Sequence, residues 1–206
     1  MSAVAREAAS QAFPQVPIRG VILPGARAAA ARAQGGPVAV LATEGTVRSG
    51  AYTRTLESLS PGTPVTAVPC PLLVPLVEAG LTEGFEAENA VRLYLHSALT
   101  PHDARTVILG CTHYPFLLPT LTRIAGPEVA FIDPAGETVR ELACLLEKRE
   151  LGAEPAGSAP AHTFFATGDP GAFAHGAGAF LGAVAAAPER LWWHEGRLTA
   201  DGGCTD

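Results

Sequence analysis

The sequence predicts an α/β protein with mostly parallel strands. Short apolar runs alternate with longer segments of helical periodicity along most of the chain. This alternation is typical of layered folds in which helices cover a parallel sheet. Hydrophobic residues make up 48% of the 206 residues, which is ample for the core of one large domain or two small ones.

Each expected element follows from its local pattern. Seven short runs bounded by turn residues predict strands at residues 18–23, 37–43, 64–68, 106–110, 129–132, 162–166 and 190–193. The segments between them have helical patterns at residues 25–33, 46–59, 72–79, 85–98, 116–124, 136–150 and 171–185. Residues 152–160 (GAEPAGSAP) have the composition of a linker, and the tail after His194 is expected to be disordered.

Charge and hydropathy narrow the functional class. The net charge of −6 argues against nucleic acid or an anionic membrane surface as the main partner. No apolar run approaches the roughly 20 residues that span a bilayer. The N-terminal residues lack the layout of a signal peptide, so we expect a cytoplasmic protein.

The cysteines and the single lysine constrain the chemistry. Cys70, Cys111, Cys144 and Cys204 are widely spaced without a CxxC pair, so we expect free thiols and no metal site. Cys70, which precedes a proline, is expected to serve packing. Lys148 is the only lysine and lies in a charged run typical of a helix end. Pyridoxal enzymes need a shielded lysine, so that cofactor is nearly excluded.

Three loops with reactive or polar side chains each follow an expected strand: LATEGT, VPCP and LGCTHYP. Because ligand sites of parallel sheets lie at the carboxyl ends of strands, we expect a shared site there. In the third loop, Cys111 could lie near a helix N-terminus, which favours a thiolate. Thr112 could bind an anion and His113 could shuttle a proton. Composition alone slightly favours a buried cysteine, a capping threonine and a surface histidine.

The other polar candidates also have structural alternatives. Thr43 and Thr46 could hold a carboxylate, although helix capping by Thr46 is the commoner role. Glu78, near the end of an expected helix, could bind an ammonium in a cleft but is more often solvated. Asp133 and Asp169 are expected to cap helices rather than to act in catalysis.

The motifs ATEGTVRSGAY, PCPLLVPLVEAG and LGCTHYPFL, in this order, resemble the second half of glutamate racemase. The resemblance covers roughly residues 2–193. Aspartate racemases are less similar, since they usually carry a glutamate in place of His113. The resemblance implies a two-domain parallel-sheet racemase fold and interconversion of L- and D-glutamate without a cofactor. It also implies supply of D-glutamate for peptidoglycan, a small-molecule substrate, and compatibility with a homodimer.

The resemblance also implies roles for individual residues. Family members use two cysteines, one on each face of the substrate's α-carbon, as exchanging acid and base. By this match Cys111 is the second cysteine and His113 assists it. The hydroxyl residues Thr43, Thr46 and Thr112 match positions that hold the substrate's carboxylates. Glu78 matches an acid near the ammonium or the histidine.

One departure from the family limits this interpretation. The family's Asp-Ser-Gly motif and its Cys-Asn-Thr box, which holds the first cysteine, do not occur here. We therefore expect an N-terminally truncated chain with no substitute thiol. Residues 1–20 and 132–193 would belong to an incomplete first α/β domain, residues 21–131 would form the complete second domain, and residues 194–206 a disordered tail. The alternatives are a non-catalytic domain that binds a small dicarboxylate, an inactive fragment, and a related isomerase with another substrate.

Overall fold

The computed structural model describes residues 2–151, 162–182 and 187–200. The chain forms two compact units, residues 1–152 and 153–206. Each unit is described by itself.

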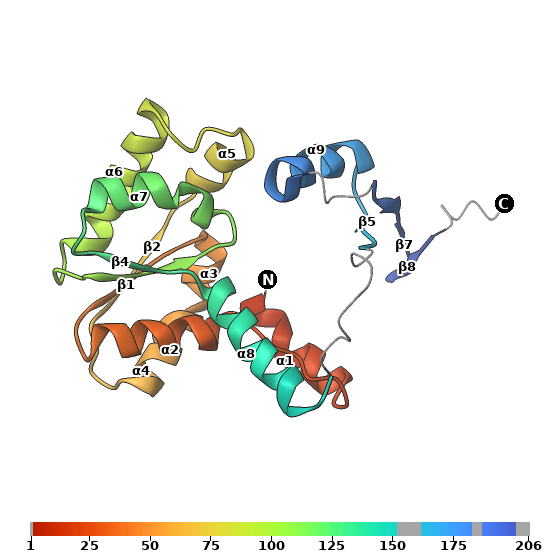
Figure 1. Cartoon of the computed structure of the whole chain (residues 1–206), viewed down its shortest axis with the longest axis horizontal. Coiled ribbons are helices and arrows are strands. Elements are labelled where there is room, and N and C mark those ends of the chain that lie inside the picture. Colours follow the sequence, from red (N-terminus) through yellow and green to blue (C-terminus); the bar gives the residue numbers. More distant parts are fainter. Residues whose placement is uncertain (1, 152–161, 183–186, 201–206) are drawn as a thin grey trace. The chain divides into compact units, whose positions relative to one another are not determined.

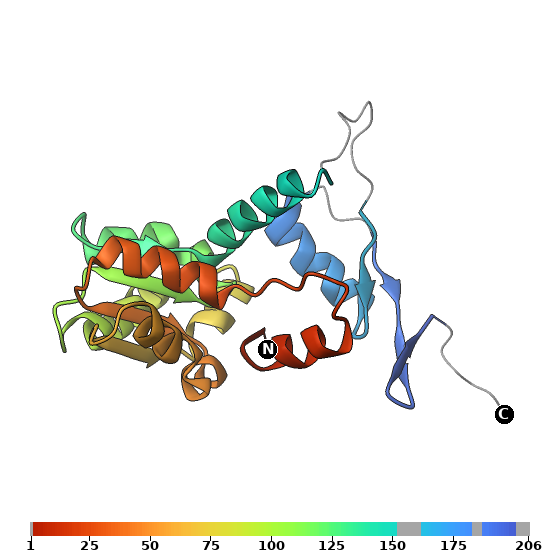
Figure 2. The same cartoon turned by 90° about the horizontal axis from the view of Figure 1, so that it is seen from below.

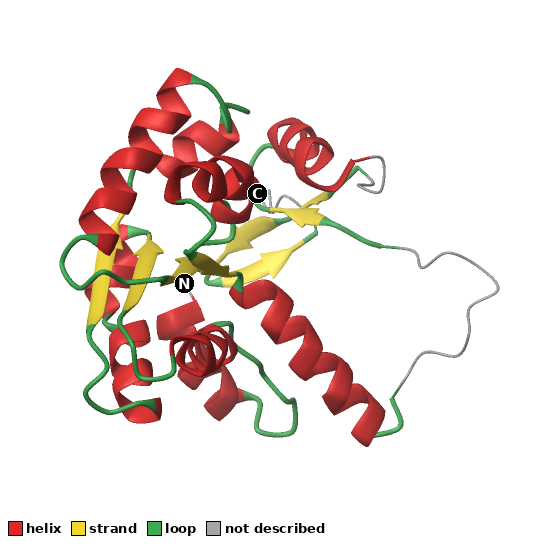
Figure 3. Cartoon of the chain, turned by 60° about the vertical axis from the view of Figure 1, so that its left-hand side comes forward, coloured by secondary structure: helices red, strands yellow, loops and turns green. Residues whose placement is uncertain are grey.

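A four-stranded parallel sheet forms the centre of the first unit (Figures 1 and 3). Its strands are β1 (Val38–Ala42), β2 (Val65–Pro69), β3 (Thr106–Gly110) and β4 (Ala130–Ile132), arranged in the order β2-β1-β3-β4. All three strand pairs are parallel, which confirms the predicted α/β class and the four strands expected here.

Helices cover both faces of this sheet, with α2 and α4 on one side and α6 and α7 on the other (Figure 1). The first unit contains α1 (Ser2–Ala12), α2 (Ile22–Ala33), α3 (Glu44–Ser49), α4 (Ala51–Leu59), α5 (Leu73–Glu78), α6 (Phe85–Leu99), the 3₁₀ helix η1 (Tyr114–Leu117), α7 (Leu118–Ala125) and α8 (Pro134–Lys148). Alternate residues of β1 pack against α2 and α4 in one buried cluster, which includes Val38, Val40, Ala26 and Leu56.

The register of the sheet brings three loops to one edge. Ala42, the last residue of β1, pairs with both Pro69 of β2 and Gly110 of β3. The loops that start at Thr43 and Cys111 therefore leave the sheet side by side. From β1 the chain continues to β2 on one side of β1, and it then returns to β3 on the other side of β1. The strand order therefore reverses between β1 and β3, which is the switch point of the sheet. In open α/β sheets, ligands bind at this position.

Among the expected elements that differ from the structure are one strand and one helix of the first unit. Residues 18–23 form no strand, because Ile22 and Leu23 instead begin α2. The helix expected at residues 46–59 is two helices, since Gly50 adopts a left-handed conformation (φ 61°) that ends α3 and starts α4. A helix that the sequence pattern did not predict, α1, contacts α3 and is joined to α2 by residues 13–21 (Figure 2).

Helix α8 packs against α2 and leaves part of its apolar surface open. Gly25 of α2 lies so close to Pro134 that an added Cβ would come within 2.8 Å of the proline ring. Farther along α8, Val139, Leu142 and Leu146 are exposed. Lys148 ends the helix and is exposed, as expected from its charged surroundings. In the part of the chain that the structure describes, no helix is long and apolar enough to cross a membrane.

The second unit contains α9 (Pro170–Leu181) and two small strand pairs. Strand β5 (Phe165–Ala166) pairs in parallel with β6 (Glu189–Arg190), and β7 (Trp192–His194) pairs with β8 (Arg197–Thr199) in a hairpin. Asp169 caps α9 through the backbone N–H of Ala172 (2.7 Å), as predicted.

The expectation of disorder directly after His194 is wrong for this hairpin. Glu195 and Gly196 both have positive φ (45° and 78°), which suits a two-residue hairpin turn. The predicted linker at residues 152–160 and the last six residues, 201–206, lie outside the described residues.

Candidate functional site

A cavity of about 490 Å³ opens at the carboxyl edge of the sheet, beside the switch point. It is lined by Val21, Thr43, Thr46, Tyr52, Leu109, Gly110, Cys111, Thr112, Pro115, Phe116, Asp133, Pro134 and Ala135. Four of the six residues that the sequence singled out therefore share one cavity. The other two are not in the lining: His113 lies next to Cys111, and Glu78 lies next to His113.

Cys111 follows the last residue of β3 and is partly buried. Its Sγ lies 3.8 Å from Nδ1 of His113. Burial raises the pKa of the Cys111 thiol, and a hydrogen bond from the backbone of His113 offsets this only in part. The expectation of a favoured thiolate is therefore wrong, because desolvation outweighs the stabilisation by the backbone.

His113 connects Cys111 to Glu78. Nε2 of His113 lies 3.3 Å from Oε1 of Glu78, which is the last residue of α5. The Glu78 side chain is 61% exposed and that of His113 is 26% exposed, so this ion pair is screened by water. A carboxylate on one ring nitrogen and a thiol near the other orient the imidazole for proton transfer with sulfur. Of the two partners left open for Glu78, the structure shows the histidine beside it.

The two threonines after β1 bond to each other. Thr43, not Thr46, is the N-cap of α3, and its Oγ1 accepts a hydrogen bond from the backbone N–H of Thr46 (3.4 Å). The two hydroxyl oxygens are 3.0 Å apart. Thr112 lines the same cavity and is exposed. Helix capping and a place in the cavity are thus compatible, because the Thr43 hydroxyl caps α3 while both threonines line the cavity.

The other described thiols do not line this cavity. Cys70 is fully buried, its thiol donates to the carbonyl of Val68 (3.3 Å), and burial raises its pKa to about 12. Its backbone carbonyl accepts a hydrogen bond from the Tyr114 hydroxyl (3.0 Å), so its packing role is confirmed. Cys144 is exposed on α8 and borders a different hollow. Cys204 lies outside the described residues.

Sequence reasoning missed two polar residues of the cavity. Asp133 was expected only to cap a helix; it does accept a hydrogen bond from the backbone N–H of Ala135 (2.9 Å), but it also lines the cavity. Tyr52 is almost fully buried on α4 and lines the cavity as well. Its only signal in the sequence was its place in the motif ATEGTVRSGAY.

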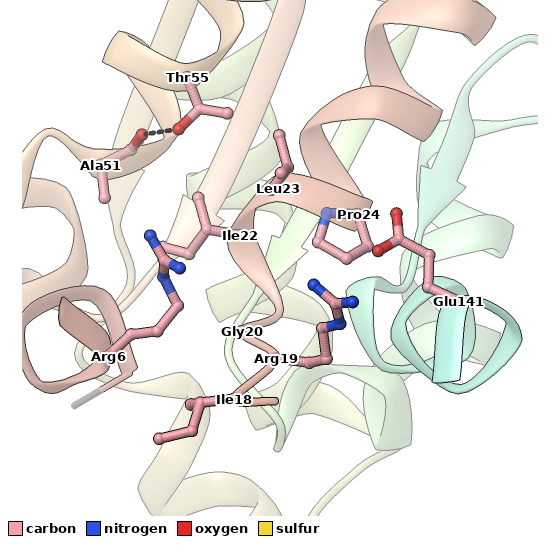
Figure 4. A pocket seen from close by; sticks show the side chains of 10 residues that line it. All are labelled: Arg6, Ile18, Arg19, Gly20, Ile22, Leu23, Pro24, Ala51, Thr55 and Glu141. Carbon is pink, nitrogen blue, oxygen red and sulfur yellow. Dashed lines mark hydrogen bonds between the residues drawn. The ribbon is translucent and has the colours of Figure 1, made fainter. Parts of the chain in front are cut away.

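A second cavity of about 280 Å³ in the first unit contains none of the predicted site residues (Figure 4). Arg6, Arg19 and Glu141 contribute charged side chains to its wall, and Thr55 bonds to the carbonyl of Ala51 (2.8 Å). Both arginines are exposed, so their charges are hydrated. Across the described ranges, no cluster of three or more His, Cys, Asp or Glu side chains could hold a metal ion.

The fold and the cavity define an α/β protein with a thiol, a histidine and hydroxyl groups at the switch point of a parallel sheet. The family model for Asp/Glu/hydantoin racemases matches residues 1–142. The chain therefore belongs to the Asp/Glu/hydantoin racemase family.

Individual relatives agree with this assignment. A glutamate racemase of Limosilactobacillus fermentum is 44% identical over 142 residues, which are 69% of this chain and 53% of that protein. A glutamate racemase of Geobacter metallireducens is 41% identical over 181 residues, or 88% of this chain and 66% of that protein. The chain thus spans between about half and two thirds of the length of these relatives.

Solved structures show the same fold. Glutamate racemase isoform RacE1 from Bacillus anthracis superposes with a TM-score of 0.78 at 33% identity, covering 95% of this chain and 72% of that one. A Francisella tularensis glutamate racemase, solved in complex with D-glutamate, also has a TM-score of 0.78, at 26% identity, covering 92% of this chain and 68% of that one.

Proposed function

We propose that the protein interconverts L- and D-glutamate without a cofactor, and that Cys111 is one of two proton carriers at the α-carbon. The observation that carries this proposal is the array of Cys111, His113 and Glu78, whose thiol borders a cavity lined with hydroxyl groups. Thr43, Thr46 and Thr112 hold the substrate's carboxylates. The product serves as D-glutamate for peptidoglycan in the cytoplasm.

The ionisation of the thiol suggests how Cys111 can act both as the acid and as the base. The raised pKa keeps a proton on sulfur, so the thiol can act as the acid that protonates the carbanion. In the opposite direction, the thiol first passes its proton to Nδ1 of His113, and Glu78 stabilises the imidazolium that forms. The thiolate then removes the proton from the α-carbon.

Inversion needs a second carrier on the opposite face of the α-carbon. Neither Cys70 nor Cys144 lines the cavity that contains Cys111. We therefore propose that the second thiol belongs to a segment outside these 206 residues, which agrees with the share of each relative that the chain spans. In this proposal residues 21–131 are the complete domain, and residues 1–20 and 132–193 belong to the other domain.

The test uses a chimera of two segments. The part of the Limosilactobacillus fermentum racemase that precedes its match to this chain is fused to the N-terminus of residues 1–206. We expect the folded chimera to convert L-glutamate to D-glutamate, measured by circular dichroism. Cys111→Ala should lower this rate by about 10²–10⁴-fold or more, since one face of the α-carbon then lacks an acid or base. Cys144→Ala, which replaces an exposed thiol away from the cavity, is the control and should keep the rate.

Full turnover in Cys111→Ala would contradict the role of this thiol. A folded chimera that binds D-glutamate without turnover would instead support the alternative of a non-catalytic domain that binds a small dicarboxylate.

A further inference from the structure

Tyr52 is a buried side chain that has no hydrogen-bond partner among the described residues. It lies in the first turn of α4, only 4% of it is exposed, and it lines the cavity that contains Cys111. Gly110 leaves room for its ring, because a Cβ there would lie 3.2 Å from Cε2 of Tyr52. The ring therefore lies between α4 and the end of β3, and Tyr52 lines the same cavity as Cys111, the residue after Gly110.

The Tyr52 hydroxyl keeps some exposure to solvent. It makes no hydrogen bond with any described residue, unlike the hydroxyls of Tyr94 and Tyr114, which bond to Leu72 and Cys70. Among the described residues, no fully buried side-chain oxygen or nitrogen lacks a partner. The hydroxyl of this buried residue must therefore be open to solvent, and the cavity is the space that its side chain borders.

The surroundings of Tyr52 make it a neutral donor. Burial, and to a smaller extent the charge of Asp133, raises the pKa of Tyr52 above its usual value, so the hydroxyl keeps its proton over the physiological range. Asp133 lines the same cavity, but no bond joins its carboxylate to the hydroxyl. A hydroxyl that is open to water can exchange that water for an ionised acceptor that enters the cavity, and hydrogen bonds to charged groups are the stronger ones.

We infer that the Tyr52 hydroxyl donates a hydrogen bond to a carboxylate of the acid that binds in this cavity. The inference rests on the proposed function, since it takes glutamate as that acid. It extends the group of binding hydroxyls from Thr43, Thr46 and Thr112 to a residue on α4 that lines the same cavity. Tyr52 is then a further binding residue of the site.

The experiment measures how acids protect Cys111 in the 206-residue chain. Iodoacetamide alkylation is followed by mass spectrometry of the tryptic peptide 106–123, in which Cys111 is the only cysteine. D-glutamate and glutarate are titrated against the wild-type chain and Tyr52→Phe, which removes the hydroxyl but keeps the ring. Tyr94→Phe is the matched control, because it removes a buried tyrosine hydroxyl that does not line the cavity.

We expect both acids to slow alkylation of the wild-type chain. In Tyr52→Phe the half-protecting concentration of each acid should rise roughly tenfold, the typical effect of losing a hydrogen bond to a charged group. The control should match the wild type. The alkylation rate without ligand and the thermal midpoint should stay unchanged in Tyr52→Phe, which separates a binding role from a packing role.

Equal protection of the wild type and Tyr52→Phe would overturn the inference and leave the proposed function standing. Weaker protection by glutamate alone, with glutarate unaffected, would assign the hydroxyl to the ammonium side and also overturn it. If neither acid protects the wild-type chain, both the inference and the proposed binding of glutamate in this cavity fail.

Discussion

At the scale of single residues, the ionisation of Cys111 decides what the site can do. Burial raises the pKa of the Cys111 thiol, and a raised pKa favours the protonated thiol, which is an acid rather than a nucleophile. To serve as a base it must lose its proton to a neighbour, and His113 is placed to accept it. In the proposed reaction the pair holds one proton on either sulfur or nitrogen, which racemisation in both directions requires.

The raised pKa gives a prediction for pH dependence. Because iodoacetamide reacts with the thiolate, the alkylation rate of Cys111 should rise with pH to a midpoint above that of the same cysteine in the urea-unfolded chain. The folded state binds this proton more tightly, so the thiol favours folding below the unfolded pKa, and that contribution is lost as pH rises through the folded pKa. Rate–pH profiles of peptide 106–123 check this. A folded midpoint below the unfolded one would show that the helix and backbone dominate over burial.

At the scale of elements, the contact between α2 and α8 fixes one wall of the cavity. Val21 precedes α2, and Asp133 and Pro134 begin α8, and all three line the cavity. The close approach of Gly25 to Pro134 holds the two helix starts together. Side-chain volume at one glycine therefore determines both the packing of α8 and the shape of the candidate site.

Replacing Gly25 with alanine should destabilise the chain. Alanine is intrinsically better in a helix by about 1 kcal/mol, but the new Cβ would meet a buried, rigid proline ring, and such overpacking costs about 1–3 kcal/mol. Gly136→Ala makes the same change in α8 where nothing lies within 4 Å, so it should be as stable as the wild type or more so. Urea unfolding of both variants measures the difference. Equal or greater stability of Gly25→Ala would show that α8 is free to move away from α2.

At the scale of the whole molecule, two features of the described residues are incomplete. Part of the apolar surface is not covered by other residues, and the site contains one thiol rather than two. Val139, Leu142 and Leu146 give α8 an exposed apolar stripe, and contiguous apolar patches of a few hundred Å² favour association or aggregation. The cavity beside the sheet contains one thiol, Cys111. Both features agree with the proposal that a further segment completes the fold and the site.

The 206-residue chain by itself should therefore not racemise glutamate and should be poorly soluble. Acid and base act in one pathway, so tighter binding cannot compensate for a missing proton carrier. Expression of the chain as given, followed by size-exclusion chromatography and an assay for D-glutamate, checks both statements. Turnover by a soluble, monodisperse sample would show that another thiol of this chain replaces the second carrier, and the proposal of an external thiol would then be wrong.

The sequence alone was sufficient for the features that depend on local pattern. The continuous apolar run before Cys111 predicted β3 to the residue, and the polar loops after β1 and β3 predicted a shared edge, because carboxyl ends of parallel strands coincide. The resemblance carried by CTHYP agrees with the family match. Local pattern failed where one residue overrode it, as at Gly50, or where an apolar pair began a helix, as at Ile22.

Only the tertiary structure decided how distant residues meet. The contact of Glu78 with His113 joins positions on α5 and the loop after β3, and its distance depends on sheet register and helix packing rather than on any spacing in the sequence. The enclosure of the Tyr52 ring and the raised pKa of Cys111 are likewise consequences of burial. Burial is a sum over neighbours from the whole fold, so residue types and spacing cannot determine it.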